Sequence, residues 1–512
     1  MVELGRFALV LAMVGATYSA GAALLSIRRR DARYLRSAEN GVLGLAGLLT
    51  LASLVLVQAL LNHDFTLRYV AEHTSRDLAP LYSVTAFWAG QSGSLLFWVL
   101  VLSWFSAAVV LQNRRSNRDL MPYVSATLIA VELFFIGLLV FVTNPFEKLA
   151  ATPPDGAGLN PLLQNHGMIF HPPALYLGYV GFTVPFAFAL GALVTGKLDA
   201  RWIVTTRRWT LFSWFFLGLG ILLGAQWAYL ELGWGGYWAW DPVENASLLP
   251  WLTATAYLHS VMIQEKKGML KVWTLSLIIL TFALCIFGTF LTRSGVISSV
   301  HSFARSSLGP LFLSFLALAL GVSLGLLLYR LPRLSSEHRL DGLLSRESSF
   351  LFNNLILVGL AFTVLWGTMF PVISEWLAGA KMSVGPPFFN RVSLPLGLAL
   401  LLLTGLCPLI AWRRATLANF KRNLMLPMGA GAVAAVVLVT AGLREPAAVG
   451  FFAGGIFVTW SIVAEFLRGT RARQSISGES FFLAFCRLVG RNKRRYGGFL
   501  VHLGMVVMLA GI

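Results

Sequence analysis

The stretch VWTLSLIILTFALCIFGTFLT, residues 272–292, decides the fold class of this 512-residue chain. It has no charged side chain, and Lys271 and Arg293 bound it on either side. A helix of this length covers about 30 Å, the thickness of the hydrocarbon core of a bilayer. The stretch therefore predicts a transmembrane helix.

Similar segments recur along the whole chain and predict about 14 transmembrane helices. The other segments are 5–27, 41–62, 91–111, 122–143, 173–194, 209–228, 247–264, 309–329, 350–371, 394–412, 424–442, 449–467 and 497 to the end. Hydrophobic residues form 57% of the chain and charged residues 12%, against about 25% charged residues in soluble domains. A soluble enzyme is excluded, and we expect an all-α polytopic membrane protein with a single integral membrane domain over 1–512.

The net charge of +18 raises the question of nucleic-acid binding, but the distribution of the basic residues explains it better. Alternate loops hold 31 of the 40 Lys and Arg residues, so the positive-inside rule places these loops in the cytoplasm and the N-terminus outside. The basic segment 468–496 is then cytoplasmic, and its apolar part 481–489 is expected to lie flat on the membrane surface. No cleavable signal peptide is expected. We expect the chain to continue past Ile512, because the last segment is short for a span.

Tryptophans gather in a predicted outer loop, 229–251, which contains WGGYWAWDPVEN at 234–245. An aromatic belt at the membrane interface is one explanation. The alternative is a platform for a planar hydrophobic ligand, because indoles offer flat faces and paired glycines allow close approach of the backbone. The residues of this candidate platform are Trp234, Gly235, Gly236, Trp238 and Trp240.

Two histidines lie in neighbouring outer loops, His171 in 144–172 and His301 in 293–308. Pro172 favours an extended backbone at His171, so we expect the next helix to begin just after it. A loop histidine is usually only solvated. Two of them beside an aromatic platform suggest axial ligands of a haem iron.

Two further histidines lie inside predicted spans. His259 lies six residues before Glu265, and His502 lies seven residues after Arg495. At 1.5 Å per residue, both sit about 9–11 Å from the cytoplasmic charges. Each can simply bond a neighbouring helix, but the matched depth favours two ligands of one haem, since buried ionisable groups in membranes are usually functional.

Charged residues at the outer side have less specific meanings. Asp241 followed by Pro242 is a natural helix start, whereas the role of Glu244 stays open between proton handling and structure. Arg293 can pair with a carboxylate such as a haem propionate or anchor its helix at the interface. The three cysteines form no CxxC pair and predict no disulfide or zinc site.

These motifs together resemble a known family. The stretch 234–244 fits the tryptophan-rich WGxxWxWDxxE signature of haem-handling proteins, and the contexts FHPPALYLGY (170–179), LHS (258–260), TRSG (292–295), VHSFA (300–304) and VHLG (501–504) resemble CcmF. CcmF is the large membrane subunit of the bacterial System I cytochrome c haem lyase. CcmC, with about six helices, fits poorly, and the nitrite-reductase-associated paralogue of CcmF is harder to exclude.

The resemblance implies a function and a set of partners. It implies that His171 and His301 ligate an incoming substrate haem, and that His259 and His502 hold a resident haem b. The partners implied are the haem chaperone CcmE, CcmH with CcmI, and apocytochrome c, at the periplasmic face of the inner membrane.

We therefore expect a haem lyase acting within a complex, which joins haem to the CxxCH thiols of apocytochrome c, with electrons supplied through the membrane haem from quinol. The alternatives are a haem exporter and a quinol-oxidising b-haem subunit. The exporter is less favoured because no charged path crosses the midplane.

Overall fold

The computed structural model describes residues 2–233, 235–297, 299, 307–336, 345–409 and 417–511. Within these ranges the chain is helical and contains no β-strand; its one β-bridge joins Leu67 and Lys148. The prediction of an all-α polytopic membrane protein is confirmed, since twelve helices are long and apolar enough to cross a membrane.

The described residues of each predicted apolar segment are mostly helical, and segment 173–194 is divided between two helices. The helices that cover these segments are α1 (Val2–Arg29), α2 (Ala32–Leu61), α5 (Gln91–Asn113), α6 (Met121–Phe141), α7 (Gly167–Gly181), α8 (Thr183–Thr195), α9 (Arg201–Glu231), α10 (Pro242–Lys267), α11 (Lys271–Ser294), α12 (Leu308–Arg330), α13 (Arg346–Ala378), α14 (Pro386–Leu406), α15 (Leu417–Thr440), α16 (Pro446–Ser477) and α18 (Lys493–Gly511). Of these, α10 and α18 are not among the twelve candidate spans. The number of crossings and the outer position of the N-terminus stay predictions.

The chain divides into two compact units. Unit 1 comprises Met1–Glu337 and Val364–Val384, and unit 2 comprises His338–Thr363 and Gly385–Ile512. The single membrane domain expected from composition stays a prediction.

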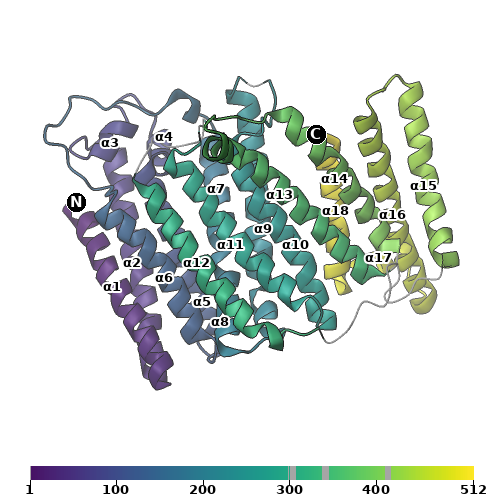
Figure 1. Cartoon of the computed structure of the whole chain (residues 1–512), viewed down its shortest axis with the longest axis horizontal. Coiled ribbons are helices and arrows are strands. Elements are labelled where there is room, and N and C mark those ends of the chain that lie inside the picture. The colour runs from purple at the N-terminus through teal and green to yellow at the C-terminus, as the bar shows by residue number, and fades with distance from the viewer. Residues whose placement is uncertain are drawn as a thin grey trace. The chain divides into compact units, whose positions relative to one another are not determined.

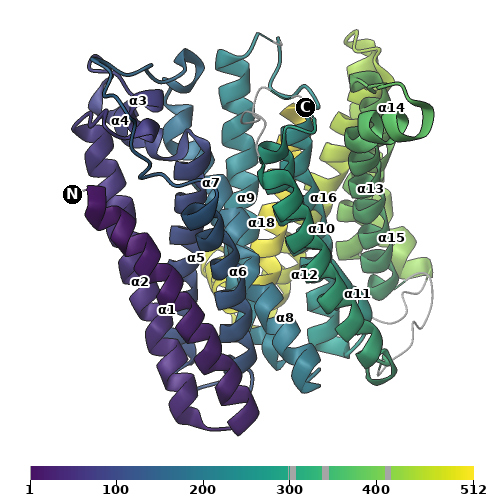
Figure 2. The same ribbon diagram turned by 60° about the vertical axis from the view of Figure 1, so that its left-hand side comes forward.

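Unit 1 begins with a helical hairpin, α1 and α2, which packs against α5 and α6 (Figure 1). Short helices, α3 (Arg68–His73) and α4 (Pro80–Thr85), follow the end of α2 and lie near the start of α1 (Figure 2). The predicted outer loop between α2 and α5 is therefore largely folded.

The core of unit 2 is formed by apolar residues of α14, α16 and α18, namely Leu401, Phe457, Val458, Ile462, Tyr496 and Phe499. Within this unit the predicted amphipathic segment 481–489 is helical, as α17 (Phe481–Arg491). Phe482 on this helix is exposed, and Arg487 pairs with Glu479. Its position on the cytoplasmic membrane surface stays a prediction.

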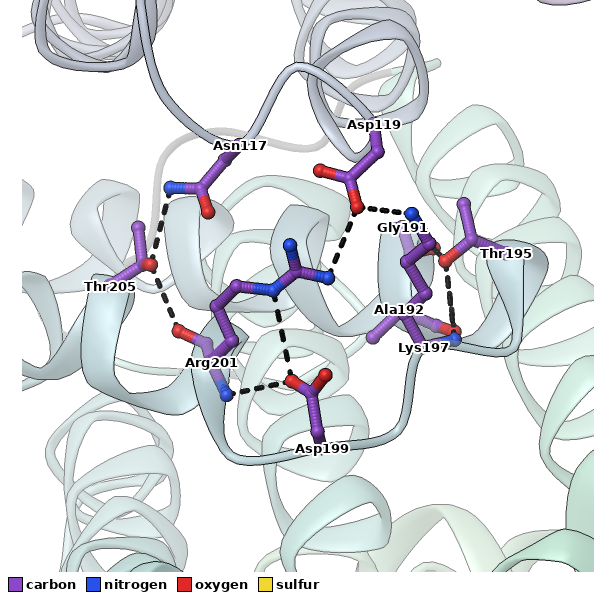
Figure 3. Close-up of polar contacts among 9 residues, drawn as sticks. All are labelled: Asn117, Asp119, Gly191, Ala192, Thr195, Lys197, Asp199, Arg201 and Thr205. Atoms are coloured by element: carbon purple, nitrogen blue, oxygen red, sulfur yellow. Dashed lines mark hydrogen bonds and ion pairs between the residues drawn. The ribbon is translucent and has the colours of Figure 1, made fainter.

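A polar cluster joins the ends of α6, α8 and α9 at one end of unit 1 (Figure 3). Asp119 accepts hydrogen bonds from Lys197 and from Arg201. Burial raises the pKa of Asp119, but the hydrogen bond from Lys197 and the nearby positive charges outweigh burial and lower the pKa overall. Arg330 of α12 reaches the same end, where it donates to the carbonyls of Leu193 and Val194 at the end of α8.

Helices α7 and α9 approach each other closely because glycine occupies their contact. A Cβ at Gly178 of α7 would lie 2.6 Å from the Cα of Leu217 on α9, closer than side chains can approach a backbone. Small residues at such contacts allow tight packing of membrane helices.

We predict that Gly178→Ala destabilises unit 1 by about 1–3 kcal/mol, the usual cost of overpacking. The matched control is Gly137→Ala on α6, because a Cβ at Gly137 meets nothing within 4 Å. Thermal unfolding in detergent measures both variants. Equal midpoints for the two variants would contradict the close contact.

A second prediction concerns pH. Because the folded-state pKa of Asp119 is lowered below the ordinary value of 3.8, its contribution to stability is present above that value and is lost as the pH falls through the lower, folded-state pKa. We expect Asp119→Asn to lower the stability by up to about 1 kcal/mol at neutral pH, with the difference shrinking in acid. The control is Asp199→Asn, whose carboxylate is more exposed and lies 3.8 Å from Arg201. A loss that does not depend on pH would exclude the ion pair as its cause.

Candidate functional site

The tryptophan-rich segment connects α9 to α10 and is shorter than the predicted loop 229–251. Helix α9 continues to Glu231 and α10 begins at Pro242, so the non-helical part is 232–241. Trp234 lies outside the described residues. The ring centroids of Trp238 and Trp240 lie 6.0 Å apart and their planes are perpendicular, at 89°.

Asp241 caps α10, as predicted, with its carboxylate accepting from the N–H of Val243 at 3.0 Å. Glu244 completes a capping box: its carboxylate accepts from the backbone N–H of Asp241 and of Ala239, both at 3.1 Å. The role of Glu244 that the sequence left open is therefore structural in this arrangement. Two backbone donors of an otherwise irregular segment are bound by one side chain.

Further bonds hold the backbone of this segment in place. Trp240 has a φ of +58°, in the left-handed region that residues other than glycine rarely adopt. Its carbonyl accepts from the amide of Asn245 at 3.0 Å, and that amide also donates to Thr368 of α13. Asp241 accepts from the hydroxyl of Ser299 at 2.6 Å, which ties this segment to the predicted outer histidine loop 293–308.

His171 lies in helix α7 and not in a loop, so the expectation of a helix beginning after it is wrong. Helix α7 begins at Gly167 and includes both Pro172 and Pro173. Pro172 has no N–H, so the carbonyl of Met168 loses its helical donor. The indole of Trp88 replaces that donor, at 3.0 Å, and so permits a helix where the sequence suggested an extended chain.

The His171 ring is oriented by helix α9. Its Nδ1 lies 2.8 Å from the carbonyl oxygen of Gly220, and a carbonyl only accepts, so Nδ1 carries the proton. In the neutral ring the lone pair is then on Nε2, the tautomer of a metal-ligating histidine supported by a second partner. The ring is also parallel to Trp227, at 8° and 6.4 Å between centroids.

Gly224 makes room for this arrangement. A Cβ at this position would lie 2.5 Å from the Cε1 and 2.8 Å from the Nδ1 of His171. Any other residue would displace the imidazole or push α9 away from α7.

Arg293 is buried inside unit 1, with 3% of its surface exposed. Its guanidinium donates to the hydroxyl of Ser94 at 2.8 Å and to that of Tyr176 at 3.2 Å. This burial argues against the interfacial anchor. A role toward a propionate stays a prediction.

His259 has the same type of bond as His171, because its Nδ1 lies 2.8 Å from the carbonyl of Thr255 one turn earlier in α10. The hydroxyl of Thr255 accepts from the indole of Trp214 at 2.8 Å. The Trp214 ring stacks on Trp251 at 5.5 Å. The turn of α10 before His259 is therefore joined to Trp214 of α9.

The remaining predicted site residues are only partly described. His502 lies in α18 within unit 2 and is half-buried, whereas His259 belongs to unit 1. His301 lies outside the described residues. Gly235 has a φ of +73° and is exposed, and Gly236 is half-buried. Their roles as ligands or as platform residues stay predictions.

Sequence reasoning missed the residues that support His171, namely Trp88, Trp227 and Gly220. Pro172 signals that a carbonyl needs another donor, but nothing in the sequence identifies a tryptophan 80 residues away. His73 is the last residue of α3. It stacks on Tyr69 at 4.4 Å, and burial lowers the pKa of His73.

Known proteins resemble the chain over its whole length. Residues 88–297 match the family of cytochrome C assembly proteins. The cytochrome c-type biogenesis protein CycK of Rhizobium meliloti is 39% identical over 515 residues, covering 100% of this chain and 75% of that protein. The protein CcmF of Pseudomonas aeruginosa is 40% identical over 518 residues, covering 100% of this chain and 77% of that protein.

A solved structure of the cytochrome c haem lyase CcmF is also similar. It superposes with a TM-score of 0.81 at 33% identity, covering 99% of this chain and 76% of that one. The resemblance inferred from the motifs is confirmed.

We predict that Trp88→Phe loosens the start of α7. The phenyl ring retains packing near Phe97 but donates no hydrogen bond to Met168, and an unsatisfied buried carbonyl costs about 1–3 kcal/mol. Amide hydrogen exchange over 167–175 is expected to accelerate. The control is Trp104→Phe, which loses a comparable bond to Thr50 on an exposed side chain. Equal exchange in both variants would show that Trp88 does not support this helix.

Proposed function

Because the chain belongs to the CcmF family of cytochrome c-type biogenesis proteins, we propose that it is the haem lyase subunit that joins haem to apocytochrome c. The observation that carries this proposal is similarity over the full chain to CcmF and to a cytochrome c haem lyase. We place the reaction at the periplasmic face of the bacterial inner membrane, since the tryptophan-rich segment lies on the side predicted to be outside.

The residues around His171 fit an incoming haem as substrate. The bond to Gly220 orients the imidazole and sets the tautomer in which Nε2 is the basic nitrogen. Trp227 restricts rotation of the ring by stacking. We propose His301, on the neighbouring outer segment, as the second ligand of this haem.

We propose that Trp238 and Trp240, in the segment after α9, supply apolar faces for the same planar ligand. Glu244 and Asn245 hold the backbone that carries them. A rigid platform fixes the position of the haem before the apoprotein arrives. The two CxxCH thiols of apocytochrome c then add to the haem vinyl groups, each forming one carbon–sulfur bond while its proton is transferred to the neighbouring vinyl carbon. Holding both partners together converts a bimolecular reaction into a local one.

A resident haem b fits the environment of His259. The Nδ1 of His259 donates to Thr255, which leaves Nε2 as the basic nitrogen for a metal. We propose His502, at a matching sequence depth, as the second ligand. When bound, this haem would supply one-electron transfer from quinol to the substrate site. The chain's contribution is to hold the imidazoles in position, as the Thr255 carbonyl does for His259.

The proposed function requires partners that deliver the reactants. We propose the haem chaperone CcmE as the donor of haem, and CcmH with CcmI as the holders of the reduced apocytochrome thiols. The chain itself has no CxxC pair for that task.

Histidine variants test the two sites separately. We expect His171→Ala and His301→Ala to lower cytochrome c maturation in cells by at least about tenfold, a typical cost of disturbing metal ligation. His259→Ala and His502→Ala are expected to remove a low-spin b-type spectrum from the purified protein. The control is His166→Ala, an exposed histidine five residues before His171.

Two outcomes would contradict this assignment. His171→Ala maturing cytochrome c as well as His166→Ala does would remove the substrate site. An unchanged haem spectrum in His259→Ala or His502→Ala would remove the resident haem.

A further inference from the structure

Helix α6 carries a carboxylic acid that has no part in the proposed function. Glu132 is the twelfth of the 21 residues of α6, in the middle of a candidate span, and 0% of its surface is exposed. Both carboxyl oxygens are buried, and neither makes a hydrogen bond to any of the described residues. Ionisable groups inside membranes are costly and mark functional sites by default.

The helices packed on α6 provide no opposite charge at this depth. Helices α5 and α8 contain no ionisable side chain. The ionisable residues of the other neighbours and of α6 itself are Glu3, Arg6, Tyr18, Arg28 and Arg29 on α1, Arg33, Tyr34, Arg36 and Glu39 on α2, Tyr329 and Arg330 on α12, and Tyr123 on α6. Tyr18 is exposed and bonded to Ser37. Glu39 lies two turns into α2 and is paired with Arg118, and the others lie near helix ends. An ionised carboxylate here would remain uncompensated, which is costly away from water.

A line of polar side chains lies between Glu132 and the turn at one end of the α5–α6 hairpin. Ser106 of α5 is the hydroxyl next to Glu132, and its oxygen is also buried without a hydrogen bond to the described residues. The two helices are antiparallel, so moving seven residues toward the turn on each helix brings Asn113 opposite Ser125. The hydroxyl of Ser125, like that of Ser106, is buried without a hydrogen bond to the described residues. Seven residues the other way, Val99 and Leu139 are apolar, although the hydroxyl of Ser103 and the indole N–H of Trp98 are buried on that side of α5.

The polar line continues to the surface at the turn between the helices. The amide of Asn117 donates to Asn113 at 2.8 Å and to Thr205 of α9 at 3.3 Å. Figure 3 shows Asn117 and Thr205 in the same cluster as Asp119 and Arg201. The line therefore leads from a charged surface to Glu132 in the middle of the helices.

We propose that Glu132 is a proton-binding site, a neutral carboxylic acid that exchanges its proton with the membrane face at the 114–120 turn. The acid releases its proton to a water molecule near Ser106, and the carboxylate takes back a proton that has entered past Asn113 and Ser125.

Successive positions along the line are about 10 Å apart, which is longer than a hydrogen bond. Exchange therefore requires entering water and is slow. Glu132 stores a proton that it exchanges with this one face.

Infrared spectroscopy of the full chain tests whether the acid is neutral. We expect a protonated-carboxyl band at neutral pH that disappears in Glu132→Gln, a variant of the same shape. The control is Glu39→Gln, since Glu39 is buried but paired with Arg118 at 2.5 Å and carries a charge. A spectrum unchanged by Glu132→Gln would overturn the proposal.

Exchange into heavy water tests the route. The band is expected to shift over time, and Ser125→Ala is expected to slow this shift severalfold. The control is Ser103→Ala, a buried serine of α5 that is satisfied by the Leu100 carbonyl at 2.7 Å. Equal rates in the two serine variants, or no shift in the unaltered chain, would overturn the route. Neither measurement depends on haem, so a failure here leaves the haem lyase proposal untouched.

Discussion

The hydrogen bond between the His171 imidazole and the Gly220 carbonyl is the constraint on which the candidate haem site in unit 1 depends. It exists only because α7 and α9 approach at glycine positions, and Gly224 leaves the space that the ring occupies. The bond sets the orientation and the tautomer of the ring together, which are the two properties that an axial ligand requires. The close approach of the α7 and α9 backbones and the orientation of the His171 ring therefore depend on the same contact.

In the segments around α7 and before α10, side chains form hydrogen bonds with backbone groups where the helix is irregular. Trp88 donates to the carbonyl that Pro172 leaves without a helical partner, and Glu244 accepts from two N–H groups before α10. Away from water, such groups are costly when unsatisfied. Side chains therefore satisfy these backbone groups in place of regular helical hydrogen bonds, and they also hold the aromatic side chains in position. Glu132 differs from these groups, because it is a buried acid without such bonds to the described residues. For that reason we propose that it binds a proton and has no structural contact to make.

Sequence patterns predicted the helices well because long apolar segments in a bilayer have few alternatives to a helix. The cap at Asp241 followed from local chemistry, in which the residue and its donors are neighbours in sequence. The position of His171 was wrong for the opposite reason. Pro172 disfavours a helix locally. Trp88, in the connection between α4 and α5, supplies the missing hydrogen-bond donor and allows the helix to form.

The sequence by itself determined the membrane class, the helical segments, the family motifs and the cap of α10, since each depends on residues within a few turns of one another. Tertiary structure alone decided which carbonyl orients His171, that Arg293 lies buried between Ser94 and Tyr176, and that Ser106 meets Glu132. These contacts join helices that are distant in sequence, and their formation depends on side-chain volume and on the absence of a Cβ at a few glycines, which composition and periodicity do not encode.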